Sequence, residues 1–368
     1  MDAVFPFGFD TPLAFYLTLY VLTLVLCAFF MTYVLAGSLY VAWATVFPGQ
    51  QHVPRCQQPL ARILREWIPF VLSGAITAGV APLLFAQIIY REQFYTANLL
   101  LGWRWLVVIP VLIVAFYLLY VLKSNVVARW SFAARCTLAT GVAGCFLFVA
   151  FCWTTNHLLG INSANWPNVY RTGTVVSSVP TLLLRLSIWV AGAFPTMAVL
   201  AGWQLWYSYR PDDAEWHDVD ICRVSRLSVG ALMIASVFGV IYMMLLDGAV
   251  QSNLVGRPGV VWLSAIAIAV ITQIAAWACI LKKGTLAATT LVFITAGNTV
   301  ALVGTAALRE IIRLSQIDLS RIAVHAQEAR AVAGFSLFLV ATVFAGGLII
   351  LCGYLTRSAW RNESSTTA

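Results

Sequence analysis

Long apolar runs with almost no charge recur along the whole chain. Nothing charged lies between Asp10 and Arg55, and only 10% of the 368 residues are charged, where soluble domains have about 25%. About 20 mainly apolar residues are enough to cross the hydrocarbon of a bilayer as a helix. The pattern therefore predicts an all-α membrane protein. It excludes a soluble enzyme, a disordered chain and a nucleic-acid binder, although the net charge is +8.

Nine runs are long enough to span a membrane, so we expect a bundle of about nine transmembrane helices. We count the first run as one helix, because two spans of about 20 residues each would not fit in it. The bundle is expected to form a single domain over residues 1–358, followed by a flexible tail over 359–368. The expected spans lie near 13–45, 67–90, 103–122, 131–153, 180–207, 227–249, 259–281, 285–308 and 331–355.

The basic residues predict how the bundle is oriented. With the N-terminus outside and the C-terminus inside, thirteen Lys and Arg residues lie on the inner side and eight on the outer side, while Arg185 lies within a span. The shortest inner connection contains Lys282 and Lys283, and the positive-inside bias is clearest in short loops. We therefore expect an N-outside, C-inside topology.

Charged residues at the outer edge of the spans indicate a possible binding site. A charge at the centre of a spanning helix costs about 2.5–3.5 kcal/mol and usually has a partner. Arg185, near the start of the fifth span, is expected to pair with Asp247 or Glu310. The simpler interpretation is that Arg185 reaches the head groups without a partner. Arg91, Arg104 and Arg309 are expected at the same depth in the membrane as Arg185. We therefore expect a site there that binds a quinone head group or an anionic ligand.

The four histidines limit the haem chemistry of the chain. His52 and His217 are expected in inner loops, His157 and His325 in outer loops, and none in the middle of a span. A stacked pair of b-type haems needs four histidines inside the bundle. A cytochrome b with two haems, formed by this chain alone, is therefore disfavoured. One interfacial b-type haem would use His157 and His325 as axial ligands. Solvated loop histidines are the simpler interpretation of both.

Sequence motifs for independent catalysis are missing. The eight cysteines form no CxxC or CxxCH motif, and the chain has no GxSxG, Walker A or HExxH sequence. Polar residues inside the spans leave a transporter as the alternative, with Arg185, Gln273 and Asn298 at its substrate site. Transporters usually contain an inverted repeat, and we find none here.

Two segments carry a resemblance to a known family. They are TLVLCAFFMTYVLAGSLYVAW (23–43) and GVAPLLFAQIIYREQFYTANLLLGWRWL (79–106). Together with nine spans and an outer N-terminus, they resemble the large subunit of cytochrome bd-type quinol oxidases and related bacterial respiratory membrane proteins. That family has a haem-ligating histidine on the first span, where the nearest residue here is Cys27. A histidine on the fifth span and acidic residues on the third are also missing.

The resemblance implies a non-catalytic subunit of a respiratory or electron-transfer complex in the bacterial inner membrane. Such a subunit would contact the lipid bilayer and anchor other subunits, cytochromes among them. The expected quinone pocket lies near Arg185, Arg91, Arg104 and Arg309.

Overall fold

The computed structural model describes residues 11–49, 54–176, 178–207, 214–319, 322, 343 and 347. Within this part of the chain, every regular element is a helix, and eight helices are long and apolar enough to cross a membrane. The expected ninth span, 331–355, falls almost entirely outside the described residues. The long helices are α1 (Thr11–Val46), α2 (Pro59–Ile89), α5 (Val108–Lys123), α6 (Phe132–Ile161), α8 (Val179–Tyr207), α9 (Ala214–Met244), α11 (Arg257–Lys283) and α12 (Ala288–Leu314).

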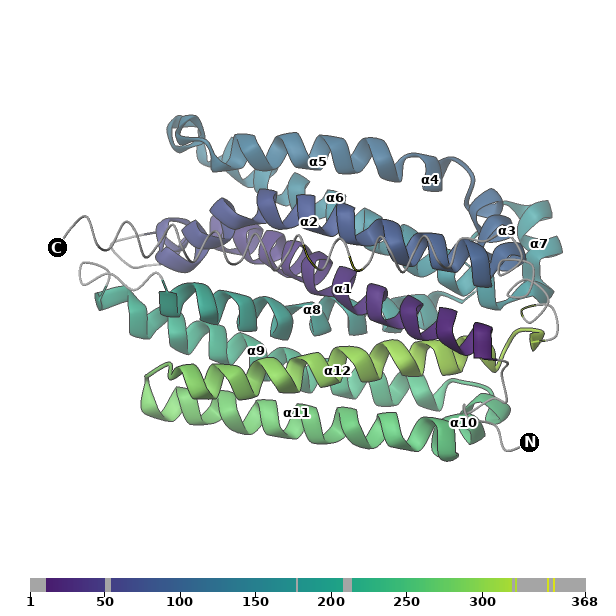
Figure 1. The fold of residues 1–368 in the computed structure, drawn as a ribbon. Coiled ribbons are helices and arrows are strands. Elements are labelled where there is room, and N and C mark those ends of the chain that lie inside the picture. The colour runs from purple at the N-terminus through teal and green to yellow at the C-terminus, as the bar shows by residue number, and fades with distance from the viewer. Residues whose placement is uncertain are drawn as a thin grey trace.

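The short helices lie at the two ends of the bundle (Figure 1). At one end are α3 (Arg91–Leu101), α7 (Trp166–Thr172) and α10 (Gly248–Val255), and we call it the α7 end. At the other end is η2 (Asn125–Arg129), between α5 and α6, and we call it the η2 end. The remaining short elements are η1 (Arg55–Gln57), α4 (Trp103–Leu106) and η3 (Ser163–Asn165).

Several helices extend beyond the apolar runs that predicted them. The first run forms one helix of 36 residues, as expected. The second begins at Pro59 rather than near 67, and the fourth ends at Ile161 rather than near 153. The sixth covers Ala214–Met244 rather than 227–249. The added turns contain polar residues that are buried against other helices, so an apolar run alone does not mark where these helices end.

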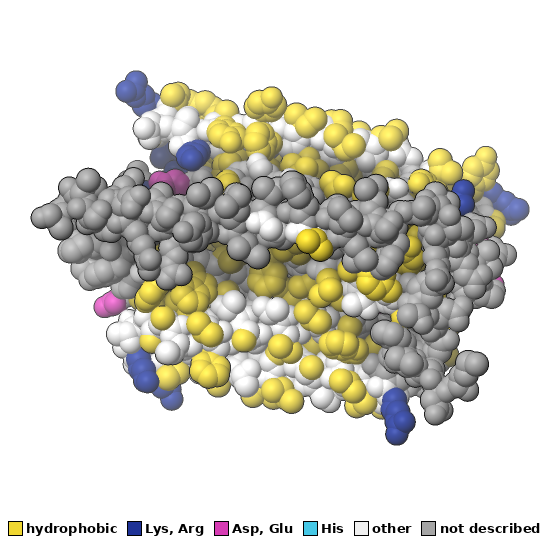
Figure 2. Space-filling model, in the orientation of Figure 1, with side chains coloured by type: hydrophobic (Ala, Val, Ile, Leu, Met, Phe, Trp, Pro, Cys, Tyr) yellow, Lys and Arg dark blue, Asp and Glu magenta, His cyan; other side chains and the backbone are white. Residues whose placement is uncertain are grey.

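Most of the protein's interior lies between α1 and the helices around it. Helix α1 packs against α2, α6 and α8, and α8 packs against α9. Tyr33, Tyr40 and Trp277 are among the largest fully buried side chains. Along the visible sides of the bundle hydrophobic side chains predominate, whereas Lys and Arg gather near its ends (Figure 2). This distribution is typical of a multi-pass membrane protein whose sides contact lipid.

Helices α11 and α12 approach each other closely because Gly304 has no side chain. A Cβ atom there would lie 2.6 Å from Cγ1 of Ile266, closer than such atoms normally come. We expect Gly304→Ala to lower the free energy of unfolding by about 1–3 kcal/mol, since Ile266 must move.

Gly141 provides the matched control. Nothing lies within 4 Å of the position of its Cβ, so Gly141→Ala should be neutral or stabilise α6 by up to about 1 kcal/mol. Unfolding of both variants by sodium dodecyl sulfate in mixed micelles measures the difference. Equal effects would contradict the close packing of α11 on α12.

Candidate functional site

His157 lies inside the protein rather than in a solvated loop. Helix α6 continues to Ile161, which places His157 within the helix, and only 4% of the residue is exposed. Neighbouring polar contacts hold this part of α6 against α3, because Asn156 donates to the side-chain oxygen of Asn98 at 2.6 Å. The interpretation of His157 as a loop residue was therefore wrong.

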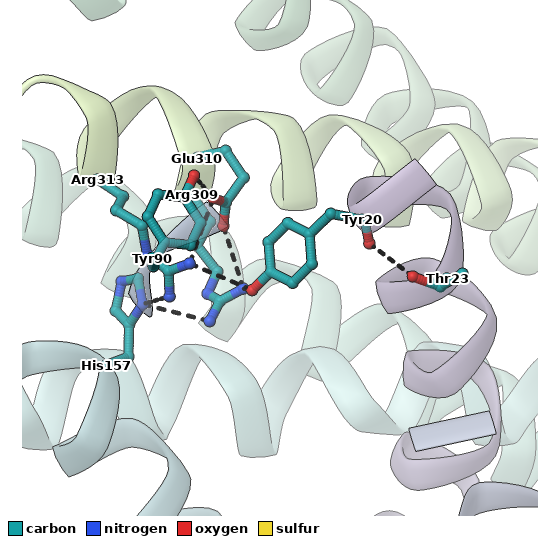
Figure 3. Close-up of polar contacts among 7 residues, drawn as sticks. All are labelled: Tyr20, Thr23, Tyr90, His157, Arg309, Glu310 and Arg313. Carbon is teal, nitrogen blue, oxygen red and sulfur yellow. Dashed lines mark hydrogen bonds and ion pairs between the residues drawn. The ribbon is translucent and has the colours of Figure 1, made fainter. Parts of the chain in front are cut away.

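Two arginines from α12 contact the same nitrogen of His157 (Figure 3). Nη2 of Arg313 lies 2.6 Å from Nδ1 of His157, and Nη2 of Arg309 lies 3.2 Å from it. Guanidinium groups only donate hydrogen bonds, so Nδ1 must accept them. The neutral imidazole then carries its hydrogen on Nε2. This second nitrogen is buried and has no hydrogen-bond partner in the described part of the chain.

Glu310 joins the same cluster from α12. It forms ion pairs with Arg309 at 3.2 Å and with Arg313 at 3.4 Å. The phenol of Tyr90 donates to Glu310 at 2.7 Å. Burial and the neighbouring carboxylate raise the pKa of Tyr90 well above its ordinary value, so this phenol keeps its proton. Tyr20 from α1 accepts from both Arg309 and Arg313, at 3.1 and 3.3 Å.

Positive charge exceeds negative charge in this cluster. Arg309 and Arg313 face one carboxylate, and Arg185 adds a third cation that interacts electrostatically with both of them and with His157. The predicted pairing of Arg185 with Asp247 or Glu310 is wrong, since its hydrogen bond goes to the hydroxyl of Tyr242 at 3.0 Å. We call Tyr20, Tyr90, His157, Arg185, Arg309, Glu310, Arg313 and Tyr242 the arginine cluster. Its excess of positive charge favours a ligand with negative or hydrogen-bond-accepting groups.

A small cavity of about 20 Å³ opens beside the arginine cluster. His157, Tyr90 and Arg313 contribute to its wall, together with the apolar side chains of Phe94 and Ile317. The side-chain oxygen of Gln93, another lining residue, is buried without a hydrogen-bond partner among the described residues. A volume of this size holds about one water molecule or one ligand oxygen. Two residues that line this cavity thus carry buried groups without partners among the described residues, the donor Nε2 of His157 and the acceptor Oε1 of Gln93.

The surroundings of His157 do not suit an axial haem ligand. A ligating nitrogen must be unprotonated, but here both arginines donate to Nδ1 and leave the hydrogen on Nε2. His325, the second expected ligand, lies outside the described residues. Among the residues that the structure describes, no three or more His, Cys, Asp or Glu side chains come together as a metal site.

Three other predicted site residues, Arg91, Asp247 and Arg104, do not belong to the arginine cluster. Arg91 begins α3 and is exposed, and Asp247 is exposed just before α10. Arg104 lies in α4, with its guanidinium carbon 5.1 Å from the centre of the Trp103 ring. Arg309 and His157 were correctly placed at one end of the bundle, and the structure brings these two into contact.

A second polar group lies in the middle of the bundle, where α8, α11 and α12 meet. Asn298 and Thr196 are both buried and lie within hydrogen-bond distance of each other. Gln273 is only 1% exposed, and neither atom of its amide has a hydrogen-bond partner among the described residues. The indole nitrogen of Trp277, one turn along α11, is also buried without a partner there. Arg185 is not among these contacts.

A third polar group, near the η2 end, was missed because Asp220 falls between two expected spans, 180–207 and 227–249. Asp220 lies in α9 and is completely buried. It accepts from the backbone N–H of Leu60 at 2.9 Å and pairs with Arg223 at 2.7 Å. Arg223 also donates to Gln58 and, at 3.4 Å, to Tyr40. The contacts join α1, the start of α2, and α9, so this group has a structural role.

Comparisons with known protein families, curated proteins and solved structures find no match to this chain. The resemblance to the large subunit of cytochrome bd-type oxidases therefore stays a prediction.

Proposed function

We propose that this chain is a membrane subunit of a bacterial respiratory or electron-transfer complex and that its arginine cluster binds a quinone head group. The observation that carries the proposal is the buried Nε2 of His157, which has no hydrogen-bond partner among the described residues, in a side chain that lines a cavity together with Arg313. A quinone carbonyl oxygen accepts hydrogen bonds and is the group that such a donor would bind.

The chemistry of quinone reduction fits the charges around this cavity. Reduction places negative charge on the quinone oxygens, and Arg185, Arg309 and Arg313 supply an excess of positive charge at this depth. Gln93 offers a buried acceptor for the hydroxyl of a quinol. Phe94 and Ile317 provide apolar surface for the ring, while the cavity itself accommodates one oxygen. Because the sequence has no motif for a redox centre of its own, electrons would come from a partner subunit that this chain anchors.

Purification with native partners tests this role. We expect the chain to copurify with at least one redox subunit, which a reduced-minus-oxidised spectrum would reveal, and with bound quinone that organic solvent extracts. A monodisperse chain without partner and without quinone, purified under conditions that preserve known respiratory complexes, would contradict the proposal.

Two substitutions of His157 separate ligand binding from structural support. In His157→Asn the amide oxygen can replace Nδ1 as acceptor for Arg309 and Arg313, but nothing replaces the donor Nε2. In His157→Gln the longer side chain can replace Nε2 but not Nδ1. We expect His157→Asn to retain most of the stability and to lose about tenfold in quinone affinity. His157→Gln should lose more stability and less quinone affinity.

Quinone content of the purified variants, together with their midpoints of unfolding, provides the measurement. Arg171→Gln, an exposed residue in α7 at the same end, is the control and should match the unchanged protein in both. If His157→Asn bound quinone as tightly as the control, the role of Nε2 would be disproved.

A secondary transporter is the second candidate. The buried amide of Gln273, which has no hydrogen-bond partner in the part of the chain that the structure describes, favours it. Its substrate would bind between α8, α11 and α12, beside Asn298 and Thr196. Proteoliposomes separate the two proposals. A transporter moves substrate across the bilayer and loses flux in Gln273→Leu, whereas a quinone-binding subunit shows no flux and keeps its quinone in that variant.

A further inference from the structure

A second cavity lies at the η2 end, at the opposite end of the bundle from the arginine cluster. It has a volume of about 270 Å³ and is bounded by the start of α2, the end of α5, η2 and the start of α6. This cavity shares no residue with the quinone site proposed above and has a different chemical character.

Basic side chains dominate the wall of this cavity. Arg62, Arg65, Lys123 and Arg135 line it, and Glu66 is the one carboxylate among the lining residues. Lys123 donates to the backbone carbonyl of Glu66 at 3.5 Å, so its ammonium group is held at the rim by α2. Four cations and one carboxylate give the cavity a positive potential that attracts an anion.

Two guanidinium groups have unused donors at this position. The Nε atoms of Arg65 and Arg135 are buried, and neither has a hydrogen-bond partner in the described part of the chain. A buried donor without an acceptor costs about 1–3 kcal/mol. These groups come from different helices, α2 and α6, and both line the same cavity. An anion with several oxygens would satisfy them together, and phosphate is such a group.

The surroundings of the cavity indicate where the phosphate comes from. Large apolar side chains on the same elements are exposed on the outside of the bundle, among them Phe70 on α2 (69%), Val126 on η2 (61%) and Phe132 on α6 (51%). Basic pockets between spanning helices, bordered by lipid-facing surface, bind phospholipid head groups. The cavity is smaller than most sites for drug-sized ligands, which have about 300–1,000 Å³, and its size suits a head group.

We propose that this cavity binds the phosphate of an anionic phospholipid, with Arg65 and Arg135 as its principal ligands. The acyl chains would lie along the exposed apolar surfaces of α2 and α6. Arg62 and Lys123 contribute positive charge at the rim. The site would fix one lipid at the basic end of the bundle, which the positive-inside rule places on the cytoplasmic side.

The test uses the full chain in micelles of a neutral detergent and compares phosphatidylglycerol with phosphatidylcholine. We expect phosphatidylglycerol to raise the midpoint of thermal unfolding in a saturable manner, and phosphatidylcholine to have little effect. In the double variant Arg65→Gln/Arg135→Gln, the phosphatidylglycerol concentration that gives half of the maximal shift in the unfolding midpoint should rise about tenfold. The double variant Lys282→Gln/Lys283→Gln removes the same charge at the same end, outside the cavity, and should respond like the unchanged protein.

Other outcomes would overturn the assignment. A shift with phosphatidylglycerol that is the same in both double variants would mean that the cavity is not the site. An equal shift with inorganic phosphate would mean that the ligand is a soluble phosphate rather than a lipid. If the double variant does not fold, Arg135→Gln alone near the start of α6 repeats the test, with retained lipid counted by native mass spectrometry. Retention of as much phosphatidylglycerol as in the unchanged protein would contradict the proposal.

Discussion

Replacing Glu310 with glutamine should lower the free energy of unfolding by about 3–5 kcal/mol. The carboxylate forms ion pairs with Arg309 and Arg313 and accepts the hydrogen bond of Tyr90. Glutamine keeps the shape and one acceptor but removes the negative charge that Glu310 contributes to the arginine cluster. The guanidinium groups would then repel one another in a buried environment, where water screens them poorly.

Unfolding by sodium dodecyl sulfate in mixed micelles measures this loss. Asp247→Asn is the matched control, because Asp247 is an exposed acidic residue at the same end of the bundle. Its substitution should change stability by no more than about 0.5 kcal/mol. If Glu310→Gln and Asp247→Asn were equally stable, Glu310 would not be the charge that holds the arginine cluster together.

Replacing Asp220 with alanine should produce a loss of similar size, about 3–5 kcal/mol. The substitution leaves the backbone N–H of Leu60 without its acceptor and removes the ionic partner of Arg223. Both groups lie where α9 packs on the start of α2, and Asp220 is completely buried. Asp220→Asn retains an acceptor for Leu60 and should lose less stability than the alanine variant.

Asp218 supplies the control for this second prediction. It lies two residues before Asp220 on α9 and is exposed. Alanine at this position should change the free energy of unfolding by no more than about 0.5 kcal/mol. Unfolding curves of Asp220→Ala, Asp220→Asn and Asp218→Ala, recorded under the same conditions, test whether the loss of stability decreases in that order. A loss in Asp218→Ala as large as that in Asp220→Ala would contradict the structural role of the buried pair.

The all-helical architecture could be predicted from the sequence because lipid imposes it. A long apolar run such as Thr11–Val46 must satisfy its backbone hydrogen bonds internally, and a helix is the way for one segment to do so. The lengths of α6 and α9 could not be predicted in this way. Their polar ends, which include His157 and Asp220, are buried by contacts with other helices.

The arginine cluster could be predicted only in part. Arg309, Glu310 and His157 were expected near one face, because the order of the spans places them there. Their contacts with Tyr20 and Tyr90 depend on how α1 and the junction between α2 and α3 lie against α12, which no local pattern encodes. One signal was present: Arg309 and Arg313 are four residues apart and therefore share one side of a helix. The expected eighth span, 285–308, ended before both residues.

Titration of the purified chain with a short-chain quinone, in nanodiscs made of neutral lipid, tests the central claim most directly. Quenching of tryptophan fluorescence can report the binding. We predict one saturable site per chain and an affinity about tenfold weaker in His157→Asn than in Arg171→Gln. The same affinity in both variants, or no saturable binding in the unchanged protein, would contradict a quinone site at His157.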